Sequence, residues 1–330
     1  MNLNTSSKER WLITGGLGYI GAHVAREFIA TGFKVFIADN LSTGIMERLP
    51  REANFIECDV RNSVSIRNIC DEFGIDGIVH MAAFKHARES KLNPSKYFGN
   101  NLGGTLGLVE GMMGTTVRKF LFSSSCSIYG NASGVPENAT PNPQSPYASS
   151  KWLSEILLKE SLAASEVTFT ALRFFNVIGC GDFPGSQDRS LECLIPTIAD
   201  KMNRLKPISV YGTELETPDG TCIRDYLDVR DVASAHSIVA RSMNLEEFPQ
   251  AINVSSGSPI SVKQVIEEFE RILSKKLLVE SCPSNPADPI AIWSQKSIIL
   301  ESLGWKPKYN LRDSISSHLQ ATRAYTKDAT

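Results

Sequence analysis

The chain has 330 residues, of which 42% are hydrophobic and 21% charged, as in an ordinary globular protein with one large or two interlocked domains. A net charge of −2 argues against a nucleic-acid partner and against an anionic membrane surface. The seven cysteines are scattered, with no CxxC pair and no histidine cluster at metal spacing, so we expect reduced thiols, no metal site and a cytoplasmic location. A polar N-terminus, with no apolar run of 18 residues later, predicts neither a signal peptide nor a membrane span.

A glycine-rich turn follows the first apolar strand, which begins at Trp11. The run Gly15-Gly-Leu-Gly18-Tyr-Ile-Gly21 leads into a helix predicted over residues 22–30. Such glycines let the backbone approach a pyrophosphate, and the N-terminus of the helix offers free N–H groups. The next strand, over 34–39, ends in Asp39, placed to hydrogen-bond an adenosine ribose and to repel a 2′-phosphate. The pattern favours NAD over NADP; the alternative is a glycine turn and a surface aspartate without a dinucleotide.

Strands and helices continue to alternate along the chain. Strands are predicted over 55–59, 77–83, 119–125 and 168–175, and helices over 63–72, 95–113 and 152–164. Short loops between such elements imply right-handed crossovers and a doubly wound parallel sheet of the Rossmann-like α/β class. Ligands bind at the carboxyl ends of such strands, so one crevice is expected to contain Gly15, Asp39, Asp59, Ala82, Ala83 and Ser125.

A tyrosine and a lysine, Tyr147 and Lys151, stand four residues apart at the start of the helix predicted over 152–164. Residues at this spacing share one face of a helix. A tyrosine that acts as a base near neutrality must lower its pKa by roughly three units, which corresponds to about 4 kcal/mol, and a nearby cation favours this. By itself the pair also fits a chance occurrence, but Ser125, at the end of the preceding strand, is expected to converge with it.

Six motifs occur in the order seen in extended short-chain dehydrogenases/reductases. They are Thr14-Gly-Gly-Leu-Gly-Tyr-Ile-Gly21, Asp39-Asn-Leu-Ser-Thr-Gly44, His80-Met-Ala-Ala-Phe-Lys85, Asn100-Asn-Leu-Gly-Gly-Thr105, Ser123-Ser-Ser-Cys-Ser-Ile-Tyr-Gly130 and Gln144-Ser-Pro-Tyr147-Ala-Ser-Ser-Lys151. Among these proteins the chain most resembles UDP-glucose (UDP-galactose) 4-epimerases. Further matches at 172–176, 219–226 and 303–307 extend the resemblance over nearly the whole length. The first half is highly specific for the superfamily, and the second half is less specific for the substrate.

The resemblance implies a role for each matching residue. The catalytic group is implied to be Ser125, Tyr147 and Lys151. Contacts to NAD are implied for Gly15, Gly18, Tyr19, Ile20, Gly21, Asp39, Asn40, Ser42, Thr43, Asp59, Val60, Met81, Ala82, Ala83, Lys85, Asn100, Ser123, Tyr147, Lys151 and Phe174. Contacts to a nucleotide sugar are implied for Lys85, Ser125, Tyr147, Asn176, Cys193, Leu194, Tyr211, Arg224, Asn285, Asp288 and Ile292.

The implied reaction is an epimerisation at C4 of a nucleotide-activated hexose through a 4-keto intermediate. Tyr147 takes the proton of the 4-hydroxyl, Ser125 orients that hydroxyl, and Lys151 lowers the tyrosine pKa. One alternative is an epimerase, dehydratase or reductase of this superfamily that acts on another activated sugar. Another is a regulatory protein that binds NAD without turnover. The 4,6-dehydratases of the family carry an Asp-Glu pair where this chain has Cys126 and Ser127, which argues against that reaction.

The resemblance also implies a division of the chain and a partner. Residues 1–176 and 225–255 are expected to form the NAD-binding domain, and 177–224 and 256–330 a smaller α/β substrate domain, in which residues 281–310 complete the cap. A homodimer through a two-helix contact is expected. The substrate side departs from the family pattern at Asn285, where an arginine is usual, at Cys193, where an asparagine is usual, and at Phe174, where a tyrosine is usual. These changes leave the sugar and the nucleotide open.

Overall fold

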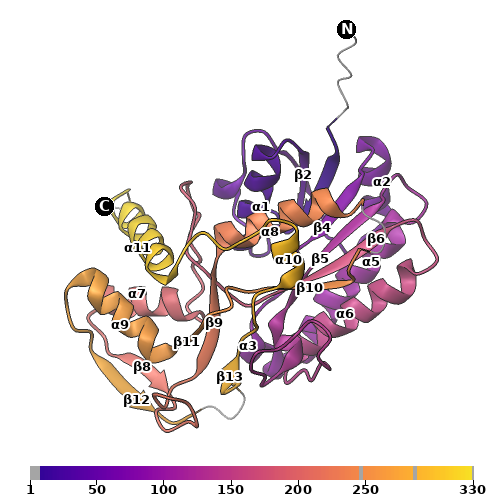
Figure 1. Cartoon of the computed structure of the whole chain (residues 1–330). Helices are drawn as coiled ribbons and strands as arrows, with labels where there is room; N and C mark the ends of the chain where they lie inside the picture. Colours follow the sequence, from indigo (N-terminus) through magenta and orange to yellow (C-terminus); the bar gives the residue numbers. More distant parts are fainter. Residues whose placement is uncertain (1–7, 245–247, 285–287, 329–330) are drawn as a thin grey trace.

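The structure is a computed structural model that describes residues 8–244, 248–284 and 288–328, with side chains to residue 322. Figure 1 shows a larger half, which contains the sheet of the N-terminal strands, and a smaller half with α7, α9 and α11. The chain crosses between the halves several times, because the orange segments β10 and α8 lie with the indigo and magenta strands (Figure 1).

A seven-stranded sheet forms the centre of the larger half, in the order β10-β6-β5-β4-β1-β2-β3, and all its strand pairs are parallel. The order reverses between β1 and β4, which is where doubly wound sheets bind ligands. The predicted Rossmann-like fold is therefore confirmed. The strands are β1 (Arg10–Thr14), β2 (Lys34–Asp39), β3 (Asn54–Glu57), β4 (Gly77–His80), β5 (Lys119–Ser125), β6 (Thr168–Phe174) and β10 (Ala251–Val254).

Helices cover both faces of this sheet because alternate residues of each strand point to opposite sides. Trp11 and Ile13 of β1 pack in the core under α1 (Tyr19–Ala30) and α8 (Val229–Ser242), whereas Leu12 packs in the core on the other face. That second face is covered by α2 (Ser63–Phe73), α5 (Gly103–Met112) and α6 (Pro146–Leu162). Both faces are apolar, as a fully covered parallel sheet requires.

The smaller half has its own core, which includes Ile198, Val265, Phe269 and Ile315. Its helix α9 begins with a capping box, in which Ser261 and Gln264 satisfy each other's backbone N–H groups. The strands are β7 (Asn176–Ile178), β9 (Ile223–Asp228), β11 (Pro259–Ser261) and β13 (Ala291–Ile292) in one sheet, with β8 (Ile208–Tyr211) and β12 (Val279–Cys282) in a pair. The helices are α7 (Leu194–Asn203), α9 (Val262–Leu273) and α11 (Leu311–Asp328).

The helix predicted over 95–113 is interrupted. The structure has α3 (Ala87–Leu92), α4 (Pro94–Tyr97), a π-helical turn η2 (Phe98–Leu102) and then α5. In this turn the buried amide of Asn101 bonds to the backbone of Phe84 and to the hydroxyl of Ser150. A π turn widens the helix locally and is frequent at functional sites. A periodicity argument does not detect such an inserted residue.

The helix predicted over 152–164 begins earlier, at Pro146, with Ser145 as its N-cap. The proline at the first helical position needs no N–H partner, which favours this start. Two short 3-10 turns, η1 (Met46–Arg48) and η3 (Cys126–Tyr129), complete the loops at the sheet edge. In the segment with α10 (Ile298–Ser302), Leu300 and Trp305 pack in the core of the larger half.

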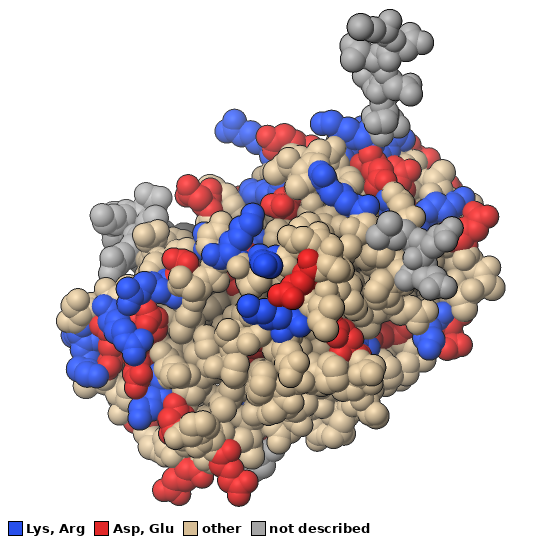
Figure 2. Space-filling view, in the orientation of Figure 1, with Lys and Arg blue, Asp and Glu red and all other residues tan. Residues whose placement is uncertain are grey.

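Lysines and arginines alternate with aspartates and glutamates over the face shown in Figure 2, in keeping with the small net charge. In the described part of the chain, no helix combines the length and the apolar character needed to cross a membrane.

Candidate active site

The glycine turn after β1 forms a tight backbone cradle. Gly15 has a φ of +66°, and a Cβ there would lie 2.7 Å from the amide nitrogen of Ala82. A Cβ at Gly21 would lie 2.2 Å from the carbonyl oxygen of Gly15. Gly18 is the N-cap of α1 and offers no side chain, so the first N–H groups of the helix, at Tyr19, Ile20 and Gly21, lack the usual intrahelical acceptor. This cradle fits the phosphates of a dinucleotide.

The carboxylate of Asp39 lies beside the cradle. It accepts hydrogen bonds from the backbone N–H groups of Leu17 (3.0 Å) and Leu41 (2.9 Å) and is largely buried. The next acid, Asp59, is bonded to Arg61, and this hydrogen bond lowers the pKa of Asp59 to about 2. Both acids are therefore held at the carboxyl ends of β2 and β3, where hydroxyl groups of a nucleoside can bind them.

One pocket brings most of the predicted cofactor residues together. It is lined by Gly15, Gly18, Asp39, Asn40, Ser42, Thr43, Val60, Met81, Ala82, Ala83 and Asn100. Ala38, Cys58 and Phe84 also line the pocket. We did not predict these three residues, although each is adjacent in the chain to a residue that we did predict.

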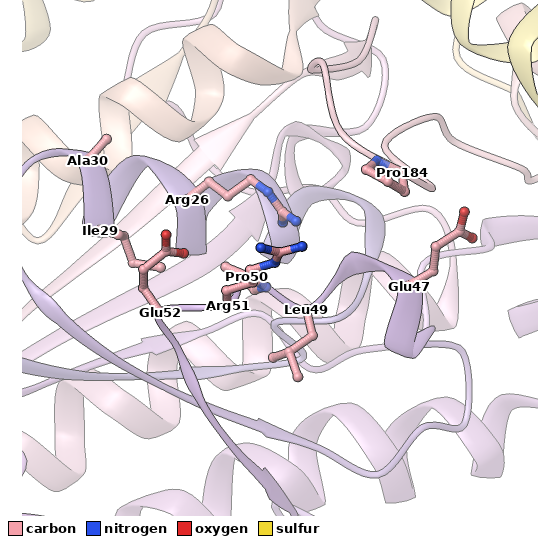
Figure 3. Close-up of a pocket in the computed structure, with 9 residues that line it drawn as sticks. All are labelled: Arg26, Ile29, Ala30, Glu47, Leu49, Pro50, Arg51, Glu52 and Pro184. Carbon is pink, nitrogen blue, oxygen red and sulfur yellow. The ribbon is translucent and has the colours of Figure 1, made fainter.

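A larger hollow of about 510 Å³ lies over the outer side of α1 (Figure 3). It is lined by residues of α1 and of segment 47–52, together with Pro184, and none of the predicted site residues lines it. The chemistry of the lining, rather than the volume, therefore identifies the cofactor pocket.

Ser125, Tyr147 and Lys151 come together at the end of β5. Ser125 is the last residue of this strand and hydrogen-bonds Tyr147, which lies in the first turn of α6. One helical turn later, the Nζ of Lys151 donates to the carbonyl oxygen of Ser123 (2.8 Å). The hydroxyl of Ser123 is in turn 3.1 Å from Nε2 of His236 on α8. The predicted catalytic group is thus an assembled cluster in this structure.

The pKa values in this cluster depend mainly on burial. Burial raises the pKa of Tyr147 to about 12, while its hydrogen bond to Ser125 and the charge of Lys85 lower it. Burial lowers the pKa of Lys151 to about 7, and the carboxylate of Glu155 raises it. The ammonium group of Lys151 is directed at the Ser123 carbonyl, and Lys85 is a second cation near the phenol, whose charge lowers the tyrosine pKa. That Lys151 also lowers this pKa stays a prediction.

A loop that sequence reasoning missed closes one side of the site. We call residues 179–193, between β7 and α7, the strap. The buried guanidinium of Arg48 donates to the carbonyl oxygens of Gly185 (2.7 Å) and Gln187 (3.1 Å) in the strap and to that of Leu17 (3.2 Å) in the glycine turn. The phenol of Tyr19 donates to the carbonyl oxygen of Gly179 (2.6 Å). The side chain of Tyr19, predicted as a cofactor contact, therefore holds the strap.

The strap carries Asp188 to Lys85, and the carboxylate lies 2.9 Å from the ammonium group. Although burial lowers the pKa of Lys85, the charge of Asp188 raises it above its ordinary value. Cys193 ends the strap as the N-cap of α7, beside Leu194. Nothing in the composition of the strap indicated these contacts, because each of them joins residues that lie far apart in the chain.

The remaining predicted residues are distributed around the cluster. Tyr211 ends β8 with 49% of its surface exposed, and the guanidinium of Arg88 lies 5.8 Å from its ring centroid. Asn176 is exposed at the start of β7, and Asp288 is also exposed. Arg224 on β9 donates to the backbone carbonyl oxygen of Ile223. Asn285 lies outside the described residues.

Three predicted side chains are in apolar surroundings. Ile292 is 4% exposed and packs in a cluster with Cys126 and Phe175. Of these residues, Cys126 directly follows Ser125 in the chain. The side chains of Ile20 and Phe174 pack against the hydrophobic core under the sheet. A contact of Ile20 with a ligand therefore has to come from its backbone.

Comparison with known proteins agrees with this geometry. The model of the NAD dependent epimerase/dehydratase family matches residues 11–255. The UDP-glucose 4-epimerase of Streptomyces lividans is 34% identical over 302 residues, which cover 90% of this chain and 91% of that protein. The structure of the UDP-glucose 4-epimerase of Stenotrophomonas maltophila with bound NAD and formylated UDP-arabinopyranose is 30% identical, with a TM-score of 0.89 over 97% of this chain and 99% of that one. The UDP-Glc/GlcNAc 4-epimerase of Campylobacter jejuni is 32% identical, with a TM-score of 0.81 over 96% and 99% of the two chains.

Proposed function

The chain belongs to the NAD dependent epimerase/dehydratase family, and on that premise we propose that it is a nucleotide-sugar 4-epimerase. The substrate is a UDP-activated hexose of the UDP-glucose/UDP-galactose type, and the cofactor is NAD. The observation that carries the proposal is the cluster of Ser125, Tyr147 and Lys151 at the end of β5, beside a pocket lined by the glycine turn and Asp39. Relatives that act on UDP-sugars over nearly the whole length of this chain support the choice of nucleotide.

NAD, when bound, supplies a hydride acceptor that returns the hydride to the other face of the sugar ring. The protein supplies the proton chemistry. Tyr147 removes the proton of the sugar 4-hydroxyl and gives it back after the 4-keto sugar has turned, and Ser125 orients that hydroxyl. Lys85 and Lys151 stabilise the phenolate by their charges: Lys85 lowers the tyrosine pKa, and Lys151 stands one helical turn after the tyrosine on α6.

The substrate side favours a UDP-hexose without deciding the sugar. Arg224 and Lys85 are the cations that we assign to the diphosphate, and Tyr211 to the base. The relatives themselves differ in the sugar, because one acts on both UDP-Glc and UDP-GlcNAc. Another activated sugar of the same class therefore remains the second candidate, and Cys193, where an asparagine is usual, is the residue that favours it.

The test uses the purified full-length protein. We expect NAD to remain bound, and NADP to bind at least about tenfold more weakly because Asp39 repels a 2′-phosphate. Incubation with a panel of UDP-, dTDP- and GDP-hexoses should convert a UDP-sugar to its 4-epimer, detected by NMR, with transient NADH absorbance. Absence of both the epimer and the absorbance for every sugar would refute the assignment.

We also propose a homodimer and a cytoplasmic location. Apolar side chains on the outer faces of α5 and α6 are exposed, among them Leu106, Leu153 and Ile156, as a two-helix interface requires. All seven cysteines are free thiols, which suits a reducing compartment. Light scattering should give the mass of two chains, and Leu153→Asp should give that of one; a monomeric wild-type protein would disprove the dimer.

The two-domain division proposed from the resemblance assigns residues 1–176 and 225–255 to the NAD-binding domain and the remaining residues to the substrate domain. The packing of Trp305 in the larger core suggests one amendment, that the segment around α10 belongs with the NAD domain. Hydrogen exchange that protects residues 298–305 together with β6 and β10 on NAD binding would support the amendment, and independent protection would contradict it.

A further inference from the structure

A third ionisable residue continues the catalytic face of α6. Tyr147, Lys151 and Glu155 follow one another at four-residue spacing, so they lie along one side of the helix. Glu155 is only 5% exposed. An ionised glutamate at such a position requires strong partners, since the burial of an isolated charge is costly.

Glu155 has these partners. Its Oε1 accepts a hydrogen bond from the hydroxyl of Ser124 at 2.5 Å. Its Oε2 accepts from Nη2 of Arg173 at 2.6 Å, and Nε of the same guanidinium lies 3.1 Å from Oε1. A bidentate pair of this kind is a strong charge-assisted contact that fixes the orientation of the carboxylate. Ser124 and Arg173 lie on β5 and β6, so the pair ties α6 to the sheet directly beneath the catalytic residues.

Arg173 approaches the carboxylate from the far side. Its Nη1 donates to the phenol of Tyr129 and to the carbonyl oxygen of Glu137, both at 2.8 Å. Lys151 lies one turn before Glu155 on the same side of α6, and both side chains are buried. Lys151 itself is 5% exposed, and its ammonium group donates to a backbone carbonyl.

The other ionisable groups around Lys151 do not replace this charge. His80 on β4 and His236 on α8 are buried, and burial lowers their pKa values to about 3 and about 4, so both are neutral near pH 7. Burial raises the pKa of Tyr147 to about 12, so its phenol is neutral near pH 7 in this structure as well. The titratable and charged groups that face Lys151 are thus Tyr147 and Glu155 from α6, His80 from β4, His236 from α8 and, through Glu155, Arg173 from β6.

We propose that Glu155 is a positioning residue of the reaction: its buried carboxylate keeps Lys151 in the ammonium form, and Arg173 holds that carboxylate in place. The inference rests on the proposed function, because it assigns the charge of Lys151 a role in epimerisation. Glu155 touches neither substrate nor cofactor in this scheme. It acts only through Lys151, whose pKa burial lowers and Glu155 raises.

The main test is the substitution Glu155→Gln, which keeps the shape and one acceptor but removes the charge. Without the carboxylate the pKa of Lys151 falls, so the lysine loses its proton at a lower pH. The alkaline limb of the kcat profile should then move down by about one to two pH units. Glu155→Asp, which keeps the charge, should restore part of the shift. The matched control is Glu160→Gln, an exposed glutamate on the same helix, which should leave the limb unchanged.

Loss of the carboxylate also leaves Arg173 buried without its partner, which by itself destabilises the protein. The double variant Glu155→Gln/Arg173→Met removes both charges and should recover thermal stability. If Glu155 acts through Lys151, the alkaline limb of the kcat profile of the double variant stays at the lower pH, even though its thermal stability has recovered. A double variant whose alkaline limb coincides with that of the wild type would overturn the proposal, since Glu155 would then be merely structural.

A second readout does not depend on turnover. The phenolate absorbance of Tyr147, taken as the difference between each protein and its Tyr147→Phe version, reports the ionisation of the tyrosine. In Glu155→Gln the midpoint should lie at higher pH than in the wild type, because a neutral Lys151 no longer favours the phenolate. An unchanged midpoint would contradict the inference. If the wild type epimerises no sugar, the proposed function fails, while this titration still decides the role of Glu155.

Discussion

The cofactor pocket and the substrate side of the site are built in different ways. The pocket is built from backbone: glycines without a Cβ, the N-terminus of α1 and the ends of β1, β2 and β4. The substrate side is built from side chains that meet across the fold, such as Lys85 with Asp188 and Arg48 with the strap. Backbone requirements leave a motif in the sequence, whereas cross-fold contacts do not. The same difference predicts which substitutions disable the cofactor pocket and which disable the substrate side of the site.

The largest effect should follow from the residue that both regions share. Tyr147→Phe removes only the phenolic oxygen, so kcat should fall by about 10²- to 10⁴-fold, the usual contribution of a general acid or base. Bound NAD should remain, because the cradle is untouched. The measurement combines steady-state kinetics with quantification of the cofactor after denaturation. Activity within tenfold of the wild type would show that another group is the base.

A backbone clash should disable the cofactor pocket alone. The Cβ of Gly21→Ala would lie 2.2 Å from the carbonyl oxygen of Gly15, so the turn must open. We expect NAD affinity to fall by about 100-fold, which corresponds to the loss of about one to two hydrogen bonds to a charged group. The control is Gly103→Ala in α5, where the added Cβ meets only the Phe98 carbonyl oxygen, at 3.9 Å. Calorimetric titration with NAD gives both affinities; equal values would mean that the turn does not hold the phosphates.

Loss of the Arg48 side chain should loosen the strap. Arg48→Met leaves three carbonyl oxygens without their cationic donor, so we expect the KM for the nucleotide sugar to rise by about 10- to 100-fold while kcat changes less. Limited proteolysis should then cut the strap faster. Arg51→Met, an exposed arginine three residues along the chain, is the control. Identical KM values for the two variants would show that the strap does not position the substrate.

The smallest effect concerns the sugar. By family resemblance Ile292 lies at the wall near the sugar 2-substituent; it is branched at Cβ and packed beside Phe175, so it cannot swing aside. We expect a 2-hydroxy sugar to be preferred over its 2-acetamido analogue by about 10- to 200-fold in kcat/KM, the range for a small misfit in an apolar pocket. Ile292→Gly should narrow this preference by about tenfold. A wild-type enzyme that uses both sugars equally would contradict the assignment of this wall.

Much of the larger half was predictable from the sequence. The strands β2 and β5 have the predicted bounds, and the glycine turn and Asp39 line one pocket as expected. Hydrophobic periodicity, turn glycines and strand-end acids are local signals, because they depend on backbone conformation and on immediate neighbours in the chain. The convergence of Ser125 with Tyr147 followed from the rule that parallel strands end at one edge.

Only the tertiary structure decided the contacts between distant segments. The pair Lys85–Asp188 joins residues 103 positions apart, Arg48 bonds to carbonyl oxygens of the strap, and α10 packs in the core of the larger half. The direction of the Lys151 ammonium, toward the Ser123 carbonyl, and the pairing of Glu155 with Arg173 depend on how α6 docks on the sheet. The energy of such pairs depends on burial and on separation in space, and neither quantity is encoded in the spacing of residues along the chain.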